Sequence, residues 1–166
     1  LKVKVTKKVI NLFEEMAVMN KVELEARYEI DLELYTKRVQ IESRVLGDIS
    51  RNHIVPTAII YQNTLLENTK NLKEIFGAEH KNIAKEQIEL IMIISNHITE
   101  INSLVNKMVD ERKKANKLSG LKSAEYYCKK VQPFFEQIRY HCDKLETMVD
   151  DNLWPLTKYR ELLFTK

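Results

Sequence analysis

The sequence predicts an all-α protein: an elongated antiparallel bundle of three long helices, with a shorter N-terminal helix and a short C-terminal docking segment. Apolar residues recur at steps of three and four over long stretches, which is the spacing of one face of an α-helix. The chain has only three Gly and three Pro residues, so few positions favour a turn. Few turns mean few, long elements, which argues against a many-stranded sheet.

The composition is typical of an amphipathic protein with a packed core. Hydrophobic residues make up 44% of the 166 residues and charged residues 31%, which is not the balance of a disordered chain. No apolar run approaches the roughly 20 residues that span a membrane, and no secretory signal is visible. The net charge of +3 is too small to predict nucleic-acid binding. Because the chain begins at Leu1 rather than at Met, we interpret it as a fragment of a longer protein.

The N-terminal residues change pattern twice within a short distance. Residues 1–5 alternate apolar residues and Lys, which is compatible with the remnant of a strand. From Thr6, a possible N-cap, the pattern becomes helical and predicts a short helix over 6–19. Asn20 stands three residues before Glu23, the spacing of a capping box, so a second helix is expected to begin there.

This second helix, over residues 22–76, is the element around which we expect the others to pack. Pro56 removes one backbone hydrogen bond, and its ring disfavours the preceding turn. The apolar face continues on both sides of Pro56 without turn residues between, so a kink is favoured over a break. Gly77 is placed to end the helix.

Two further long helices are predicted. One covers residues 78–118 and ends before Gly120. The other covers about 121–153, and Pro155 ends it because the residue before a proline disfavours helical geometry. Pro133 lies off the apolar face of this last helix and is expected to bend it outward.

The two cysteines, Cys128 and Cys142, both fall on the apolar face of the last long helix. Fourteen residues apart on one helix, they would lie about 21 Å from each other, which is too far for a disulfide. We therefore expect two buried free thiols in a reducing compartment.

No residue pattern predicts chemistry within the chain. Helical di-metal sites use Glu-x-x-His pairs, and none of the four histidines has a Glu three residues before it. His97 and His53 lie on apolar faces and are interpreted as hydrogen-bonded core histidines, whereas His141 and Cys142 point to different sides of one helix. Three isolated glycines cannot form a phosphate-binding loop, and no nucleophile stands in a recognisable setting. We therefore predict no catalytic, cofactor-binding or metal-binding residue.

The largest basic cluster lies where the third long helix ends. We interpret it as a solvated turn whose charges suit a helix C-terminus, because no aromatic residues are interleaved for binding nucleic acid. An acidic partner is the alternative. The cluster comprises Arg112, Lys113, Lys114, Lys117 and Lys122.

The C-terminal segment 155–166 is a candidate docking tail. A short helix or turn with apolar side chains is expected there, and it either folds back on this bundle or packs on another subunit. The residues leave both possibilities open. The possible interface residues are Trp154, Tyr159, Leu162, Leu163 and Phe164.

Two stretches of the chain resemble one known family. The first, residues 23–77, contains the string NHIVPTAIIYQNT, and the second, residues 142–164, contains LWPLTKYRELLF. Together they are similar to the C-terminal helical domain of bacterial type III glutamine synthetases. Thr157 departs from the family, where a proline is expected, and this puts only the turn geometry of the tail in doubt.

The resemblance implies a cytoplasmic ligase of nitrogen metabolism that makes glutamine from glutamate, ammonia and ATP, with Mg or Mn, in a ring-shaped dodecamer. The catalytic α/β core of that family lies upstream, and none of its glutamate-, nucleotide- or metal-binding motifs matches a run of residues here. We therefore expect residues 1–166 to form a single helical domain that binds no cofactor and is not active alone.

The expected role of the chain is structural, in packing on the catalytic core or between neighbouring subunits of a homo-oligomer, with no nucleic acid or membrane as a partner. One alternative is a free-standing helical interaction module that acts through the basic turn near Lys114. A bundle enzyme with its own cofactor is the other, and the missing metal-ligand pairs argue against it.

Overall fold

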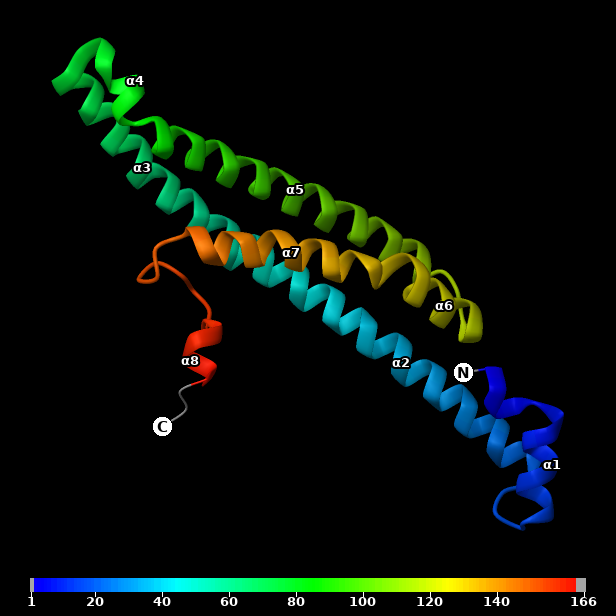
Figure 1. The fold of residues 1–166 in the computed structure, drawn as a ribbon. Helices are drawn as coiled ribbons and strands as arrows, with labels where there is room; N and C mark the ends of the chain where they lie inside the picture. The colour runs from blue at the N-terminus through cyan, green and yellow to red at the C-terminus, as the bar shows by residue number, and fades with distance from the viewer. Residues whose placement is uncertain (1, 164–166) are drawn as a thin grey trace. The chain divides into compact units, whose positions relative to one another are not determined.

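The fold is an all-α helical bundle, as predicted. The computed structural model describes residues 2–163, and these contain helices and turns but no strand (Figure 1). The chain divides into two compact units. The first unit combines the N-terminal residues up to Ser43 with Met108–Pro133, and the second combines Arg44–Lys107 with the residues from Phe134 onward.

The first unit opens with two short helices. Lys2–Val5 forms the 3-10 helix η1, so the predicted strand remnant is wrong. Among the described residues there is no strand with which this segment could pair, and an isolated strand has no ladder to stabilise it. Helix α1, Lys7–Glu15, follows Thr6, whose carbonyl accepts hydrogen bonds from the backbone N–H groups of Val9 and Ile10.

Helix α1 ends at Glu15, four residues before the predicted end. Ala17 adopts a left-handed backbone conformation with φ +50°. The N–H of Val18 donates to the carbonyl of Phe13 at 3.0 Å, and the N–H of Ala17 donates to that of Glu14 at 3.1 Å. These are the two hydrogen bonds of a Schellman motif, so an alanine occupies the position where glycine is usual.

Helix α2, Lys21–Ile49, begins where the sequence predicted it to begin. The side-chain Oδ1 of Asn20 accepts a hydrogen bond from the N–H of Glu23 at 2.9 Å. The carboxylate of Glu23 accepts one from the N–H of Asn20 at 2.8 Å. This reciprocal pair is the predicted capping box, and it satisfies two N–H groups that the start of a helix leaves free.

The chain stays helical through Pro56, so the prediction that this proline does not break the helix is confirmed. A π-helical turn, η2 (Ser50–Ile54), joins α2 to α3, Val55–Phe76. The N–H of Val55 bonds to the carbonyl of Ser50, five residues back. A π turn is wider than an α turn, which leaves room for a proline ring that would crowd the preceding carbonyl.

Pro133 is accommodated in the same way. Helix α6, Gly120–Tyr126, leads into a second π turn, η4 (Tyr127–Val131), and α7, Pro133–Met148, follows. The N–H of Gln132 bonds to the carbonyl of Tyr127 at 2.9 Å, again five residues back. Each internal proline of the long helices therefore follows a π turn.

The helix predicted over residues 78–118 is interrupted near its start. Gly77 ends α3 with φ +55°, as expected, and a 3-10 turn, η3 (Gly77–Glu79), and the short α4 (His80–Ile83) precede α5, Lys85–Ala115. Residues later in α3 contact residues earlier in α5, so the two helices run antiparallel in the second unit. Gln62 donates to the carbonyl of Ile91 at 2.9 Å and to Ser95 at 2.7 Å, and Asn68 donates to Gln87 at 2.8 Å.

The last long helix also ends early, at Met148 instead of residue 153. Asp150 then turns the chain: its carbonyl accepts the N–H groups of Leu153 and Trp154, and its side chain accepts that of Asn152 at 2.7 Å. The predicted short helix in the tail is α8, Tyr159–Leu163.

Apolar side chains from these helices form a core within each unit. In the first unit, the buried residues include Leu32, Val39, Met108, Ala115, Ala124, Tyr127 and Val131. In the second unit, they include Ala58, Ile94, Ile101, Val105, Ile138 and Leu145. Across residues 2–163, no helix is both long and apolar enough to cross a membrane.

Candidate functional site

The C-terminal tail is held to the second unit by a turn around Lys158. The ammonium of Lys158 lies 5.8 Å from the centroid of the Trp154 ring, donates to the carbonyl of Glu146 at 2.9 Å and pairs with the carboxylate of Asp151. Trp154 is half-buried, and its indole Nε1 is buried without a hydrogen-bond acceptor among residues 2–163. This turn fixes the segment from which α8 begins.

Beyond this turn, the tail presents apolar side chains to solvent. Leu162 and Leu163 on α8 are 60% and 76% exposed. Tyr159 is the first residue of α8, and Phe164 lies outside the described residues. The structure thus gathers Trp154, Leu162 and Leu163 in the segment predicted as an interface, with the tryptophan anchored and the two leucines uncovered.

Two of the four histidines form a pair in the second unit. The Nδ1 atoms of His97 and His141 lie 2.8 Å apart, and their ring centroids are 5.1 Å apart. Burial, followed by the neighbouring charges of His141 and Lys144, lowers the pKa of His97 below its ordinary value. The interpretation of His97 as a hydrogen-bonded histidine is confirmed, although the residue is only half-buried. His53 is exposed, so its interpretation as a core histidine is wrong, because the π turn at residues 50–54 changes the face on which it lies.

The two cysteines differ in their surroundings. Cys142 is buried, with its Sγ 3.6 Å from Ser50 Oγ, and burial raises the pKa of its thiol. Cys128 is exposed, so the prediction that both thiols are buried is wrong. The second π turn begins at Tyr127, and this side chain takes the core position instead. Burial, followed by the contact with Cys128, raises the pKa of Tyr35 to about 12.

Acidic neighbours on the same helix pair with part of the basic cluster at the end of α5. Lys114 pairs with Glu111 at 2.6 Å, and Lys113 pairs with Asp110 at 3.4 Å. The carboxylate of Glu111 also accepts the hydroxyl of Tyr126 at 2.6 Å. These contacts support the interpretation of the cluster as a solvated helix end.

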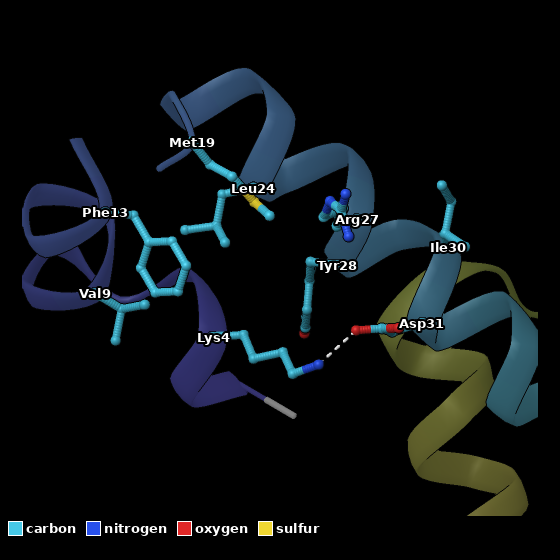
Figure 2. A pocket seen from close by; sticks show the side chains of 9 residues that line it. All are labelled: Lys4, Val9, Phe13, Met19, Leu24, Arg27, Tyr28, Ile30 and Asp31. Carbon is cyan, nitrogen blue, oxygen red and sulfur yellow. Dashed lines mark hydrogen bonds and ion pairs between the residues drawn. The ribbon is translucent and has the colours of Figure 1, made fainter. Parts of the chain in front are cut away.

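A cavity of about 550 Å³ lies in the first unit between the N-terminal segment and α2 (Figure 2). Val9 and Phe13 of α1 face Leu24 and Tyr28 of α2 across it, and the side chain of Lys4 reaches along one side to Asp31 (Figure 2). The lining residues are Lys4, Val9, Phe13, Met19, Leu24, Arg27, Tyr28, Ile30 and Asp31.

The sequence predictions do not include this cavity. It depends on the turn at Ala17, which returns the chain so that α1 faces α2, and nothing in the pattern of α1 predicts a left-handed alanine there. The available signal was the apolar face of α1, which includes Val9 and Phe13 and requires a partner helix.

No group of three or more His, Cys, Asp or Glu side chains in the described part of the chain is placed to hold a metal ion. Among the described residues that line the cavity between α1 and α2, one carboxylate is present, that of Asp31, and the side chain of Lys4 already pairs with it at 2.5 Å. The described residues therefore form a mainly apolar cavity in the first unit and an apolar surface on the tail.

Comparisons with known proteins agree with the resemblance noted from the sequence. A family model described as the glutamine synthetase C-terminal domain matches residues 1–73. A glutamine synthetase of Bacteroides fragilis is 50% identical over 151 residues, which cover 90% of this chain and 21% of that protein. A type-3 glutamine synthetase of Dictyostelium discoideum is 27% identical over 165 residues, which cover 97% of this chain and 22% of that protein. A glutamine synthetase of Butyrivibrio fibrisolvens is 24% identical over 157 residues, covering 94% and 22%. The chain spans about a fifth of the length of the curated relatives that it matches.

Proposed function

Because the chain belongs to the family of glutamine synthetase C-terminal domains, we propose that it is the non-catalytic structural and oligomerisation domain of a type III, bacterial enzyme. The parent enzyme would make glutamine from glutamate, ammonia and ATP, using Mg or Mn, in the cytoplasm. The name of the Dictyostelium relative supports the type, and the names of the other two relatives support the activity.

The lengths of the relatives support the proposed separation between a catalytic part and this structural part. The matched residues cover 21% to 22% of each relative, so most of their residues lie outside the part that matches this chain. The proposal places the catalytic core, with its nucleotide and metal, in that remaining part. This chain would then contribute packing surface to the core and to neighbouring subunits of a dodecamer.

The observation that carries the structural role is the anchored tail. Trp154 and Lys158 hold the turn before α8, and two leucines on α8 remain largely exposed. A single exposed leucine is ordinary on a protein surface, but adjacent exposed leucines on a short helix that follows an anchored turn favour a surface that another polypeptide covers. Burying both would contribute roughly 3 kcal/mol or more to association before the costs of binding.

A test uses a longer chain that contains the proposed catalytic core. We expect Leu162→Glu combined with Leu163→Glu to reduce its oligomeric mass, measured by light scattering, because two charges would have to enter an apolar contact. Lys129→Glu combined with Lys130→Glu is the matched control, since both lysines are exposed and belong to the first unit, whereas the tail belongs to the second. Truncation after Asp151 should have the same effect as the leucine variant. An assembly of unchanged mass after either change would refute the packing role of the tail.

The free-standing interaction module has less support. Two of the lysines that would recognise an acidic partner already pair with Glu111 and Asp110. Charge reversal at Lys113, Lys114 and Lys117 tests it, because such a module would lose its partner in a pull-down whereas a packing domain would keep its assembly.

A further inference from the structure

We propose that the cavity between α1 and α2 in the first unit binds a small organic anion with an apolar body and a single carboxylate, of the type of a medium-chain fatty acid. This goes beyond a packing role, because a packing domain needs no ligand cavity. The size of the cavity, its lining and the balance of donors and acceptors around it all favour such a ligand.

The size and lining fit an apolar body. A volume of about 550 Å³ lies within the range of roughly 300–1,000 Å³ that is typical of small-molecule sites. Val9, Phe13 and Met19 from the N-terminal segment and Leu24 from α2 form a continuous apolar part (Figure 2). Phe13 is half-buried and Leu24 is buried. A hydrocarbon chain placed between them would therefore be removed from contact with water on both of its sides.

The charges around the cavity favour an anion. Lys4 and Asp31 form an ion pair at 2.5 Å and balance each other. Arg27 adds a second positive charge to the lining, and no hydrogen bond or ion pair joins it to another described residue. The described lining residues therefore carry an excess of one positive charge, which one carboxylate would balance.

The balance of hydrogen-bonding groups points the same way. Arg27 is a donor only, and the hydroxyl of Tyr28 can donate, whereas Asp31 is the one carboxylate among the described lining residues and already accepts from Lys4. A ligand that enters should bring acceptors. The planar guanidinium of Arg27 matches a carboxylate in geometry as well as charge. A polyphosphate would bring several negative charges against an excess of one, so the single carboxylate fits better.

The experiment uses the purified chain and decanoate as the probe, at concentrations below those at which decanoate forms micelles. Binding is measured by calorimetry, and the site is located by backbone amide NMR shifts. Decanol provides the same body without the charge, and acetate provides the charge without the body. Decanoate should bind saturably with shifts centred on residues 4–31, and decanol and acetate should bind at least roughly tenfold more weakly.

Two variants test the residues. Arg27→Gln should weaken decanoate binding roughly tenfold or more and leave decanol binding unchanged, because only the carboxylate uses the guanidinium. Arg44→Gln is the matched control: Arg44 is an exposed arginine of the same helix outside the cavity, and its loss should change nothing. Val9→Trp should block binding by filling the apolar end, with the folded state checked by circular dichroism.

Three outcomes would overturn the proposal. One is the absence of saturable binding to the wild-type chain. The second is equal binding of decanoate and decanol, or decanoate binding that Arg27→Gln does not weaken. The third is a set of NMR shifts centred outside residues 4–31, for example on the exposed leucines of α8, which would show general adsorption to apolar surface.

Discussion

The Nδ1 atoms of His97 and His141 face each other at 2.8 Å in the second unit. A hydrogen bond between them requires that one Nδ1 carries a proton and the other does not, so the pair is stable only while at least one imidazole is neutral. The edge of the His141 ring also meets Tyr140, with ring centroids 5.2 Å apart. Helices α5 and α7 are thereby joined by a contact that depends on protonation.

This contact predicts a loss of stability in mild acid. The pKa of His97 is lowered in the folded state, from an ordinary value of 6.5, first by burial and then by the charges of His141 and Lys144. The unfolded chain therefore binds more protons below pH 6.5, and stability falls as the pH drops through that value toward the lower pKa of the folded state. Above pH 6.5, the stability that neutral His97 contributes is fully present.

We expect the free energy of unfolding to decrease by less than roughly 1 kcal/mol on this account, because the pair is only half-buried and water screens it. Urea unfolding at about pH 7.5 and about pH 5.5 measures the change. His97→Gln should show a smaller pH dependence than wild type, and His53→Gln, at an exposed position, should keep the wild-type dependence. Equal dependence in all three proteins would contradict the prediction.

The capping box predicts a specific cost at the start of α2. Asn20→Ala and Glu23→Ala each remove one of the two reciprocal hydrogen bonds, and each should destabilise the chain by about 1 kcal/mol. Glu25→Ala is a suitable control, because its exposed pair with Lys21, at 3.8 Å, contributes little. The midpoint of urea unfolding provides the comparison, and a control as destabilised as the cap variants would argue against the motif.

The two thiols should react at very different rates. The exposed Cys128 should react rapidly with a disulfide reagent such as dithionitrobenzoate. Cys142 should react only as the protein opens, since it is buried and burial raises the pKa of its thiol. Following colour development should therefore show one fast and one slow thiol per chain. Cys128→Ser should remove the fast phase alone, and loss of the slow phase instead would reverse the assignment.

Two of the positions with positive φ, Ala17 and Gly77, should respond in opposite ways to an exchange between alanine and glycine. Ala17→Gly should raise the free energy of unfolding by up to about 1 kcal/mol, because an L-residue with φ +50° is strained and glycine is not. Gly77→Ala should lower it by about 1 kcal/mol, since glycine already occupies φ +55° there. Chemical unfolding of both variants measures the change in the free energy of unfolding. If the two changes had the same sign, backbone conformation would not be what determines the effect of these substitutions.

Local patterns were sufficient to predict most of the fold. The spacing of apolar residues predicted the long helices, the Asn20–Glu23 pair predicted the start of α2, and Gly77 predicted the end of α3. Each of these signals acts over a few residues, so a sequence contains it in full. The apolar and aromatic tail residues likewise predicted a short helix or turn where α8 lies, but they did not predict how Trp154 is held.

The errors came from effects that a helical repeat does not encode. The π turns change the face on which the following side chains lie, so Tyr127 is buried where Cys128 was expected, and His53 is exposed. The early end of α1 depends on the return of the chain at Ala17. The cavity was missed for the same reason, because its two sides come from helices whose meeting is set by that turn.

The π turns also bear on how the length of this chain can vary. Removing a residue from an ordinary stretch of helix rotates everything downstream by about 100° and carries its apolar face out of the core. A one-residue deletion within residues 50–54 or 127–131 would instead convert the π turn into an ordinary α turn, in which each N–H bonds to the carbonyl four residues back. Pro56 or Pro133 would have to be replaced in the same step. The helices that follow would keep their orientation, so these two segments are where a shorter version of the chain is most easily made.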